Sequence, residues 1–131
     1  MAAMIDAELI LCQDTDTAAT VTSSVLDLGR NKVLKPLYID VKLTQGVTTG
    51  RVKSVELQTS ADEAFASPIT EMVVTVGKTA EQQKRPCQLA QFFAAIQPQG
   101  RYARLKITGD TTAPAGGKLW AYLSPDIQVP L

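Results

Sequence analysis

The chain has 131 residues, with 13 basic and 13 acidic side chains and no net charge. Hydrophobic residues make up 45% of it and charged residues 20%, a composition typical of a folded domain rather than a disordered chain. A neutral chain argues against direct binding of nucleic acid, because such proteins usually carry a basic patch. We therefore expect one compact domain over residues 1–131, which needs neither a metal nor disulfides to fold.

The sequence contains no histidine. This removes the commonest general base, the Ser-His and Cys-His nucleophile pairs, and most zinc and copper sites. Cys12 and Cys87 form no CxxC motif, and we interpret them as two buried free thiols in a reducing compartment, with a single disulfide as the alternative. We accordingly predict no catalytic residue, no cofactor and no metal site, and we do not expect an enzyme.

The motif Asp14-Thr15-Asp16 could begin a calcium-binding loop. Such a loop needs Gly at its sixth position and Glu at its twelfth, where this chain has Ala19 and Val25. We therefore interpret these acids as part of an ordinary polar segment.

No targeting or membrane segment is expected. Residues 1–29 contain no Lys or Arg, so the cationic start of a signal peptide is missing. The longest apolar run covers residues 92–96, far short of the roughly 20 residues that span a bilayer. We expect a soluble protein that is synthesised in the cytoplasm and does not contact a membrane.

The β-branched residues number 32 of 131, which favours strands. The first apolar positions, Ile5, Leu9 and Leu11, belong either to a strand or to an extended arm. Residues 21–28 form a candidate strand that ends at a glycine turn. Residues 37–43 alternate between apolar and polar side chains, which predicts a strand with one buried face.

The next elements follow after a predicted hairpin loop at residues 45–50. A second alternating strand is expected over residues 54–58. Residues 60–66 would form one helical turn with Ser60 as its N-cap. Residues 72–76 are a short continuous run of apolar residues and Thr, which suits a strand covered on both faces.

Three further segments complete the predicted set. Residues 88–96 fit either a strand or a short helix, and the strand is favoured. Residues 103–107 and 119–123 alternate again, as half-buried strands do. Seven or eight short strands with frequent turn residues indicate an antiparallel β-sandwich or barrel.

Trp120 and Tyr122 share one face of the last predicted strand. They either complete the core or cover an interface, because aromatic residues with a polar atom are common interface anchors. Exposed aromatic strips also bind sugars, so a carbohydrate-binding role remains an alternative.

Several short motifs also occur in a fixed order, at residues 25–29, 36–41, 57–68, 101–107, 115–118 and 126–128. Together they resemble the small capsid cement proteins of short-tailed bacteriophages over nearly the whole chain. The most specific element is residues 58–68, of the pattern Gln-Thr-Ser-x-Asp-x-x-Phe-x-Ser-Pro. The segment between Thr75 and Gly100 departs from the family pattern, because it is rich in Lys and Gln.

The resemblance implies an all-β, single-domain antiparallel jelly-roll β-sandwich that forms homodimers. It would bind the outer surface of the virion head, bridge neighbouring major capsid proteins and stabilise the shell after synthesis in the host cytoplasm. The family pattern supplies no catalytic residue. The alternative is a carbohydrate-binding or receptor-binding β-sandwich module of the virion.

Residues 1–16 are a candidate N-terminal arm in this setting. Its apolar side chains Met4, Ile5, Leu9 and Leu11 would contact a neighbouring subunit, since terminal segments are often ordered by a partner. Its acidic side chains would meet basic residues of the shell: Asp6, Glu8, Asp14 and Asp16. The alternative is that this segment is the first strand of the sandwich. With Trp120 and Tyr122, the four apolar arm residues form the predicted partner interface.

Overall fold

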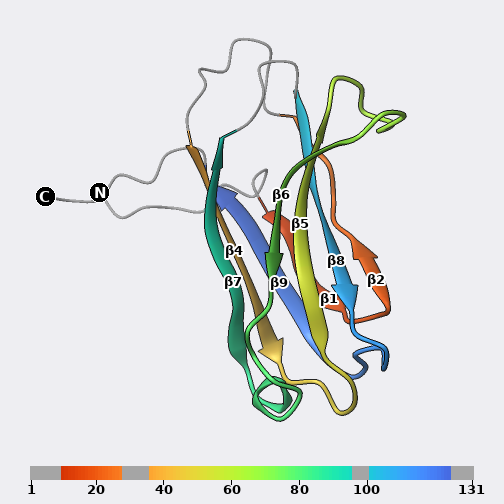
Figure 1. Ribbon diagram of the computed structural model, residues 1–131, viewed down its shortest axis with the longest axis vertical. Coiled ribbons are helices and arrows are strands. Elements are labelled where there is room, and N and C mark those ends of the chain that lie inside the picture. Colours follow the sequence, from red (N-terminus) through yellow and green to blue (C-terminus); the bar gives the residue numbers. More distant parts are fainter. Residues whose placement is uncertain (1–9, 28–35, 96–100, 125–131) are drawn as a thin grey trace, which may run out of the picture.

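The computed structural model describes residues 10–27, 36–95 and 101–124, which form two antiparallel β-sheets packed as a sandwich (Figure 1). The strands are β1 (Ile10–Asp16), β2 (Thr20–Thr22), β3 (Leu26–Asp27), β4 (Pro36–Gln45), β5 (Val52–Ser60), β6 (Ile69–Thr75), β7 (Cys87–Ala95), β8 (Tyr102–Gly109) and β9 (Lys118–Ser124). One sheet has the order β1-β9-β4-β7; the other has the order β2-β8-β5-β6, with β3 also paired to β8. The predicted all-β, antiparallel class is confirmed.

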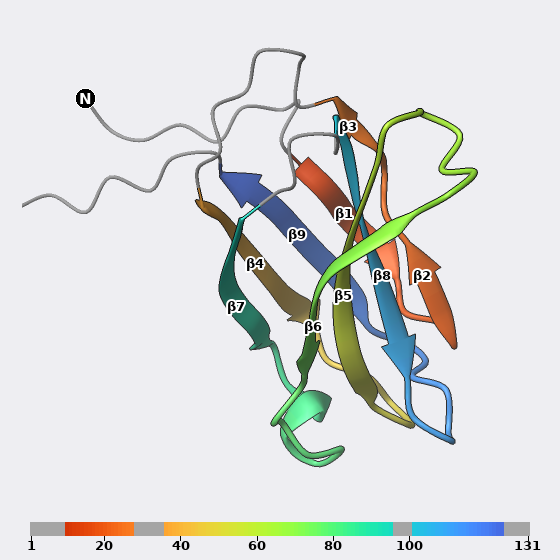
Figure 2. The same cartoon turned by 45° about the horizontal axis from the view of Figure 1, so that its top comes forward.

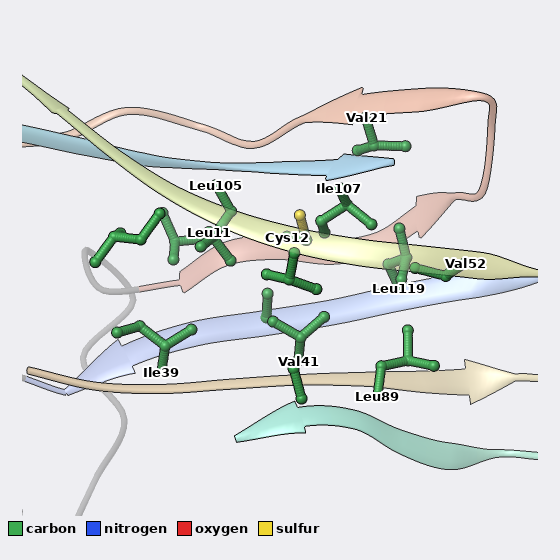
Figure 3. Close-up of a cluster of buried hydrophobic side chains, with 14 of the residues drawn as sticks. Leu11, Cys12, Val21, Ile39, Val41, Val52, Leu89, Leu105, Ile107 and Leu119 are labelled. Carbon is green, nitrogen blue, oxygen red and sulfur yellow. The ribbon is translucent and has the colours of Figure 1, made fainter. Parts of the chain in front are cut away.

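The core lies between the two sheets and follows from the alternation of side chains along each strand (Figure 3). Ile39 and Val41 of β4 have no exposed surface, and Leu105 of β8 has none either. The segments predicted from alternation all lie in strands: 37–43 in β4, 54–58 in β5, 103–107 in β8 and 119–123 in β9. Residues 88–95 lie in strand β7, so the favoured strand is confirmed over the helix.

Strand β1 occupies part of the predicted arm. It pairs with β9, and the register shifts between Ile10 and Cys12. Such an irregularity lets two consecutive residues turn to the same side, and Leu11 and Cys12 are both buried in the core, 2% and 3% exposed. The prediction that Leu11 contacts a partner is therefore wrong. Met4, Ile5 and Leu9 lie outside the described residues.

One other expectation is corrected in this part of the chain. Residues 21–28 do not form one strand, because β2 and β3 pair with β8 as two short pieces separated by residues 23–25. The acidic Asp16 pairs with Lys118 of the adjacent strand β9, and Asp27 pairs with Arg101 at 2.8 Å. These two N-terminal acids are therefore partnered within the fold.

Strand β6 is the last strand of its sheet and pairs only with β5 among the described strands. Its side chains Met72 and Val73 are 39% and 56% exposed. The prediction that this segment is covered on both faces is wrong. A continuous apolar run is compatible with an edge strand as well as with a central one, and the position is set by the chain topology.

The loop from β5 to β6 contains a turn instead of the predicted helical turn. Ser60 Oγ donates to Asp62 Oδ1 at 3.0 Å and accepts from the Asp62 N–H at 3.2 Å, so it closes a tight turn. Phe65 has a positive φ of 54° and is only 6% exposed. The Arg104 guanidinium lies 4.2 Å from the centre of the Phe65 ring. This contact and the burial of Phe65 offset the unfavourable backbone conformation of a bulky side chain.

The loop between β6 and β7 closes one end of the sandwich. It contains a short 3-10 helix, η2 (Gln82–Lys84), whose Gln83 side chain is completely buried. The Gln83 amide accepts from the Val52 N–H at 2.7 Å and donates to the Val52 carbonyl at 2.9 Å and to the Lys78 carbonyl at 3.0 Å. Gln83 thus pairs with the first residue of β5 as a strand backbone would.

Candidate docking surface

The outer face of the sheet β1-β9-β4-β7 brings together side chains that are distant in sequence. In the β4 register, Tyr38 lies opposite Phe93 of β7, and Asp40 lies opposite Tyr122 of β9. Because Ile39, Val41 and Leu43 of β4 are buried in the core, the residues that alternate with them face outward. Trp120 shares this face with Tyr122, two residues away on β9. We call Tyr38, Phe93, Trp120 and Tyr122 the aromatic face.

Tyr38 contacts two other rings of the aromatic face at an angle. The Tyr38 ring centre is 5.3 Å from that of Phe93 and 6.3 Å from that of Tyr122, with interplanar angles of 55° and 54°. These are favourable tilted contacts between aromatic rings. Tyr38 is 8% exposed and Phe93 is 54% exposed, while Trp120 and Tyr122 are half-buried. The arrangement therefore has a packed centre and an exposed Phe93 ring at its side.

Asp40 holds a buried carboxylate beside these rings. It is 6% exposed, and Gln88 Nε2 donates to its Oδ1 at 2.9 Å. Burial, the charge of Asp40 and a hydrogen bond to Asp40 together raise the pKa of Tyr122. Burial, followed by the charge of Asp40, likewise raises the pKa of Tyr38. Both phenols therefore stay protonated at neutral pH, and their side chains are fixed by internal contacts.

The outer face of the other sheet is polar and satisfies its own hydrogen bonds. Glu56 Oε2 accepts from Thr70 Oγ1 at 2.6 Å and from Gln58 Nε2 at 3.1 Å. Arg104 Nε donates to Gln58 Oε1 at 2.8 Å. The hydrogen bond from Thr70 is the main reason that the pKa of Glu56 is lowered, with Lys106 adding to the effect. Groups already paired in this way gain less from a partner than unpaired groups do.

Two shallow cavities lie at the end of the sandwich that carries η2. One of about 360 Å³ is lined by Lys78, Glu81, Gln82, Arg85, Pro86 and Cys87. The other, of about 250 Å³, is lined by Gly50, Arg51, Ala80, Asp110, Thr111 and Thr112. Burial raises the pKa of the Cys87 thiol, which makes it a poor nucleophile at neutral pH. Small-molecule sites are usually lined mainly by apolar and aromatic side chains, and these cavities are lined mainly by polar ones.

The two cysteines are free thiols. Burial in the core raises the pKa of Cys12 to about 11, so its thiol is protonated and inert. Within residues 10–27, 36–95 and 101–124 there is no cluster of three or more Cys, Asp or Glu side chains that could bind a metal ion. The same residues include no helix that is long and apolar enough to cross a membrane.

The structure places the predicted site residues as follows. Trp120 and Tyr122 lie on the aromatic face, and Leu11 lies in the core. Sequence reasoning missed Tyr38 and Phe93, although Tyr38 occupies an outward position in the alternating pattern of β4. Nothing in the sequence indicated its pairing with Phe93, because the two residues belong to strands far apart in the chain.

No model of a known protein family matches the chain, and no curated protein matches its sequence.

Proposed function

We propose that the protein is a structural capsid cement protein of a bacteriophage. It binds the outer surface of the head as a homodimer, bridges neighbouring major capsid proteins and stabilises the shell. The observation that carries this proposal is the aromatic face, a preformed interaction surface on one sheet of a fold with no apparent catalytic site among its described residues.

The order of the strands supports a jelly-roll form of the sandwich. If β2 and β3 are taken as one interrupted strand, the two sheets have four strands each. Both orders alternate early and late strands, and successive segments of the chain pass from one sheet to the other except at the β5–β6 pair, which lies within one sheet. Jelly rolls have eight strands in two sheets joined in this manner. The resemblance to cement proteins implies the same fold.

The aromatic face suits a protein partner. Interface hot spots are enriched in Trp and Tyr, and they lie in packed regions from which water is excluded. Here the exposed Phe93 ring and the half-buried Tyr122 ring both contact Tyr38. Trp120, which is also half-buried, lies two residues from Tyr122 on β9. Internal contacts hold the Tyr38, Phe93 and Tyr122 rings in place, so binding a partner there costs little side-chain entropy.

A homodimer would increase the effect of each contact with the shell. Once one subunit is bound, the attachment of the second becomes intramolecular, and avidity can exceed a single affinity by roughly 100- to 10,000-fold. A protein that binds the assembled shell but not its separated subunits stabilises the shell by mass action. Modest contacts are therefore sufficient for a cement function, and no reactive group is needed.

The aromatic face also favours a second candidate, a carbohydrate-binding or receptor-binding module of the virion. Sugars stack on exposed aromatic rings, and Asp40 is a carboxylate near such rings. However, the Tyr38 ring is tilted by 55° to that of Phe93 and by 54° to that of Tyr122, so these three rings do not form a flat platform. The carboxylate is also buried and hydrogen-bonded to Gln88. These two features favour a protein partner over a sugar.

The test is co-sedimentation of the purified protein with expanded heads that lack it. We expect saturation at a fixed stoichiometry to the major capsid protein, and heads that resist heat better after binding. Phe93→Ala and Trp120→Ala should weaken binding by about tenfold or more, as loss of an interface anchor does. Val25→Ala is the matched control, because Val25 is an exposed apolar residue away from this face.

Other outcomes would overturn the proposal. No binding to heads, or a dozen copies or fewer per particle, would exclude a cement function. Binding of glycans that Trp120→Ala abolishes would establish the alternative. Equal loss of binding by Val25→Ala and Phe93→Ala would show that the aromatic face is not the contact surface.

A contribution of the N-terminal arm is tested separately. Residues 2–9 lie outside the described residues, and their removal leaves β1 intact. We expect a deletion of residues 2–9 to weaken attachment to heads without changing the thermal stability of the protein. A deletion extended to Leu11 would also remove a core side chain and is expected to destabilise the fold. Unchanged attachment of the shorter deletion would exclude the arm.

A further inference from the structure

The loops that follow β4, β6 and β8 lie together at the end of the sandwich that carries η2 (Figure 2). They cover residues 46–51, 76–86 and 110–117. Backbone hydrogen bonds join them: the Val47 N–H donates to the Gln83 carbonyl at 2.9 Å, and the Thr48 N–H donates to the Ala115 carbonyl at 2.8 Å. These contacts hold the side chains of the three loops in a fixed arrangement.

Basic side chains collect at this end of the molecule. We call it the basic end and include Lys53, whose carbonyl accepts from the Val76 N–H at 2.8 Å. Its charged residues are five bases and two acids: Arg51, Lys53, Lys78, Lys84, Arg85, Glu81 and Asp110. The rest of the described chain has five basic and eight acidic side chains. The described fold, which is neutral as a whole, is therefore positive at one end and negative elsewhere.

Two ion pairs neutralise part of the basic end. Arg51 Nη1 pairs with Asp110 Oδ2 at 2.8 Å, and Lys84 Nζ pairs with Glu81 Oε1 at 3.4 Å. Among the described residues, no carboxylate forms an ion pair with the remaining three cations, which are Lys53, Lys78 and Arg85. Like charges repel one another, so an anionic partner would be attracted to this end and would relieve the repulsion.

The cavity of about 360 Å³ gives an anionic side chain a position at the basic end. Lys78, Arg85, Pro86 and Cys87 are among the residues that line it. Burial raises the pKa of the Cys87 thiol and the charge of Lys78 opposes this effect, so the Lys78 ammonium lies near the thiol. Pro86 and Cys87 offer apolar surface to methylene groups, and the forked guanidinium of Arg85 matches the geometry of a carboxylate. This combination suits a glutamate side chain.

Carboxylates of a polypeptide fit the basic end better than the phosphates of a nucleic acid. Single strands are usually bound by aromatic rings on which the bases stack, and none of the three loops contains an aromatic residue. Glu81 lines the same cavity as Lys78 and Arg85, and its carboxylate would repel a continuous phosphate backbone. Three cations without a partner are also fewer than the roughly 6–10 phosphate contacts of a typical DNA-binding protein.

We propose that the basic end docks an acidic segment of another protein, with a glutamate side chain of that segment in the cavity that Lys78 and Arg85 line. Lys53 contacts a further acidic residue of the same segment. This surface is separate from the aromatic face, which lies on the outer face of the sheet β1-β9-β4-β7. The inference therefore goes beyond the proposed function and gives the protein a second contact surface of different chemistry.

The test is a titration of the isotope-labelled protein with a hexaglutamate peptide, followed by NMR. An ionic strength of about 0.1 M limits the effect of charges more than about 10 Å away. We expect saturable shift changes centred on residues 78–87. The double variant Lys78→Gln/Arg85→Gln should raise the dissociation constant by at least about fivefold, as the loss of two exposed ion pairs does.

The matched control is the double variant Lys42→Gln/Lys106→Gln. It changes the net charge by the same amount, but these two lysines lie on the outer faces of the two sheets, away from the three loops. It should change the dissociation constant by less than about twofold. The thermal transition of each variant shows whether it is folded.

Glu81→Gln tests the sign of the charge without the loss of a cation. The Glu81 side chain is 84% exposed, so its replacement does not disturb the core. The change removes a carboxylate from the cavity and releases Lys84 from its ion pair. Hexaglutamate should therefore bind about two- to threefold more tightly to this variant.

Four results would overturn the inference. These are no saturable binding, an equal loss of binding in the two double variants, weaker binding by Glu81→Gln, and tighter binding of a hexamer of thymidine nucleotides than of hexaglutamate at residues 78–87. The last result would assign the surface to phosphates. The titration contains no heads, so its outcome is independent of whether co-sedimentation supports or refutes the cement function.

Discussion

The buried amide of Gln83 is expected to be a main source of stability at the end of the sandwich that carries η2. Replacing Gln83 by Ala removes both hydrogen bonds to the backbone of Val52, and Val52 itself is only 1% exposed. A buried group that loses its partner costs about 1–3 kcal/mol. Val52 would lose a partner for its N–H and for its carbonyl, and the missing side chain would leave a cavity. We therefore expect Gln83→Ala to lower the free energy of unfolding by about 3 kcal/mol.

The assay is equilibrium unfolding in urea, with the slope of the transition compared between variants. An unchanged slope would show that the loss reflects stability and not a different unfolded state. Gln82→Ala is the matched control, because the neighbouring Gln82 is exposed and its Oε1 accepts only from the Thr79 N–H. That variant should lose less than about 1 kcal/mol.

A third variant tests the polarity of the hydrogen bonds. Gln83→Glu keeps the shape, but an ionised carboxylate cannot donate to the Val52 carbonyl. The pKa of this carboxyl group in the folded state should be raised above the ordinary Glu value of about 4.3. The stability of the Gln83→Glu variant should therefore increase as the pH falls toward about 4.3. If Gln83→Ala and Gln82→Ala lose equal stability, the hydrogen bonds to Val52 do not contribute as reasoned here.

Three further predictions concern stability, reactivity and pH. Gly50 has a φ of +72°, and a Cβ there would collide with the Ala113 carbonyl oxygen, so Gly50→Ala should cost at least about 2 kcal/mol in urea unfolding. Gly77 has open space around it, and Gly77→Ala should change the stability by less than about 1 kcal/mol. The Cys12 thiol should react with a thiol reagent at pH 8 only after denaturation, because the thiol is buried and its pKa is about 11. Rapid labelling of Cys12 in the folded protein would contradict this prediction. Attachment to heads should be nearly constant from pH 6 to 8, because the chain has no histidine and the pKa of Tyr122 is raised. A phenol whose pKa is raised in the folded state stabilises the fold below the ordinary phenol pKa of about 10, and this stabilisation is lost only at higher pH. A steep change in attachment near neutral pH would contradict this prediction.

The alternation of side chains was sufficient to predict most strands, but it did not predict which strands lie at an edge. Residues 72–76 illustrate the limit. A run of apolar residues indicates only that a strand has few polar contacts. A central strand has few polar contacts, and so does an edge strand that pairs with another chain. The difference depends on the order of strands in the sheet, which no local pattern encodes.

The aromatic face was predicted only in part for the same reason. Trp120 and Tyr122 share one strand, so their common face follows from the period of two. Tyr38 and Phe93 belong to β4 and β7, and their contact depends on the register between those strands. Gln83 is similar, because a glutamine in a Lys- and Gln-rich segment is usually exposed. Only the folded chain brings its amide to the open backbone groups of Val52.

The motif at residues 58–68, which is the most specific part of the resemblance to cement proteins, has a structural explanation. Ser60 and Asp62 close the turn after β5, and Phe65 packs under the Arg104 guanidinium on the polar face of the sandwich. None of these side chains belongs to the aromatic face or to the basic end. A shared motif of this kind therefore supports a shared fold more strongly than a shared contact surface. The case for docking on a shell depends instead on Phe93 and Trp120, and substitutions at those two positions test function most directly.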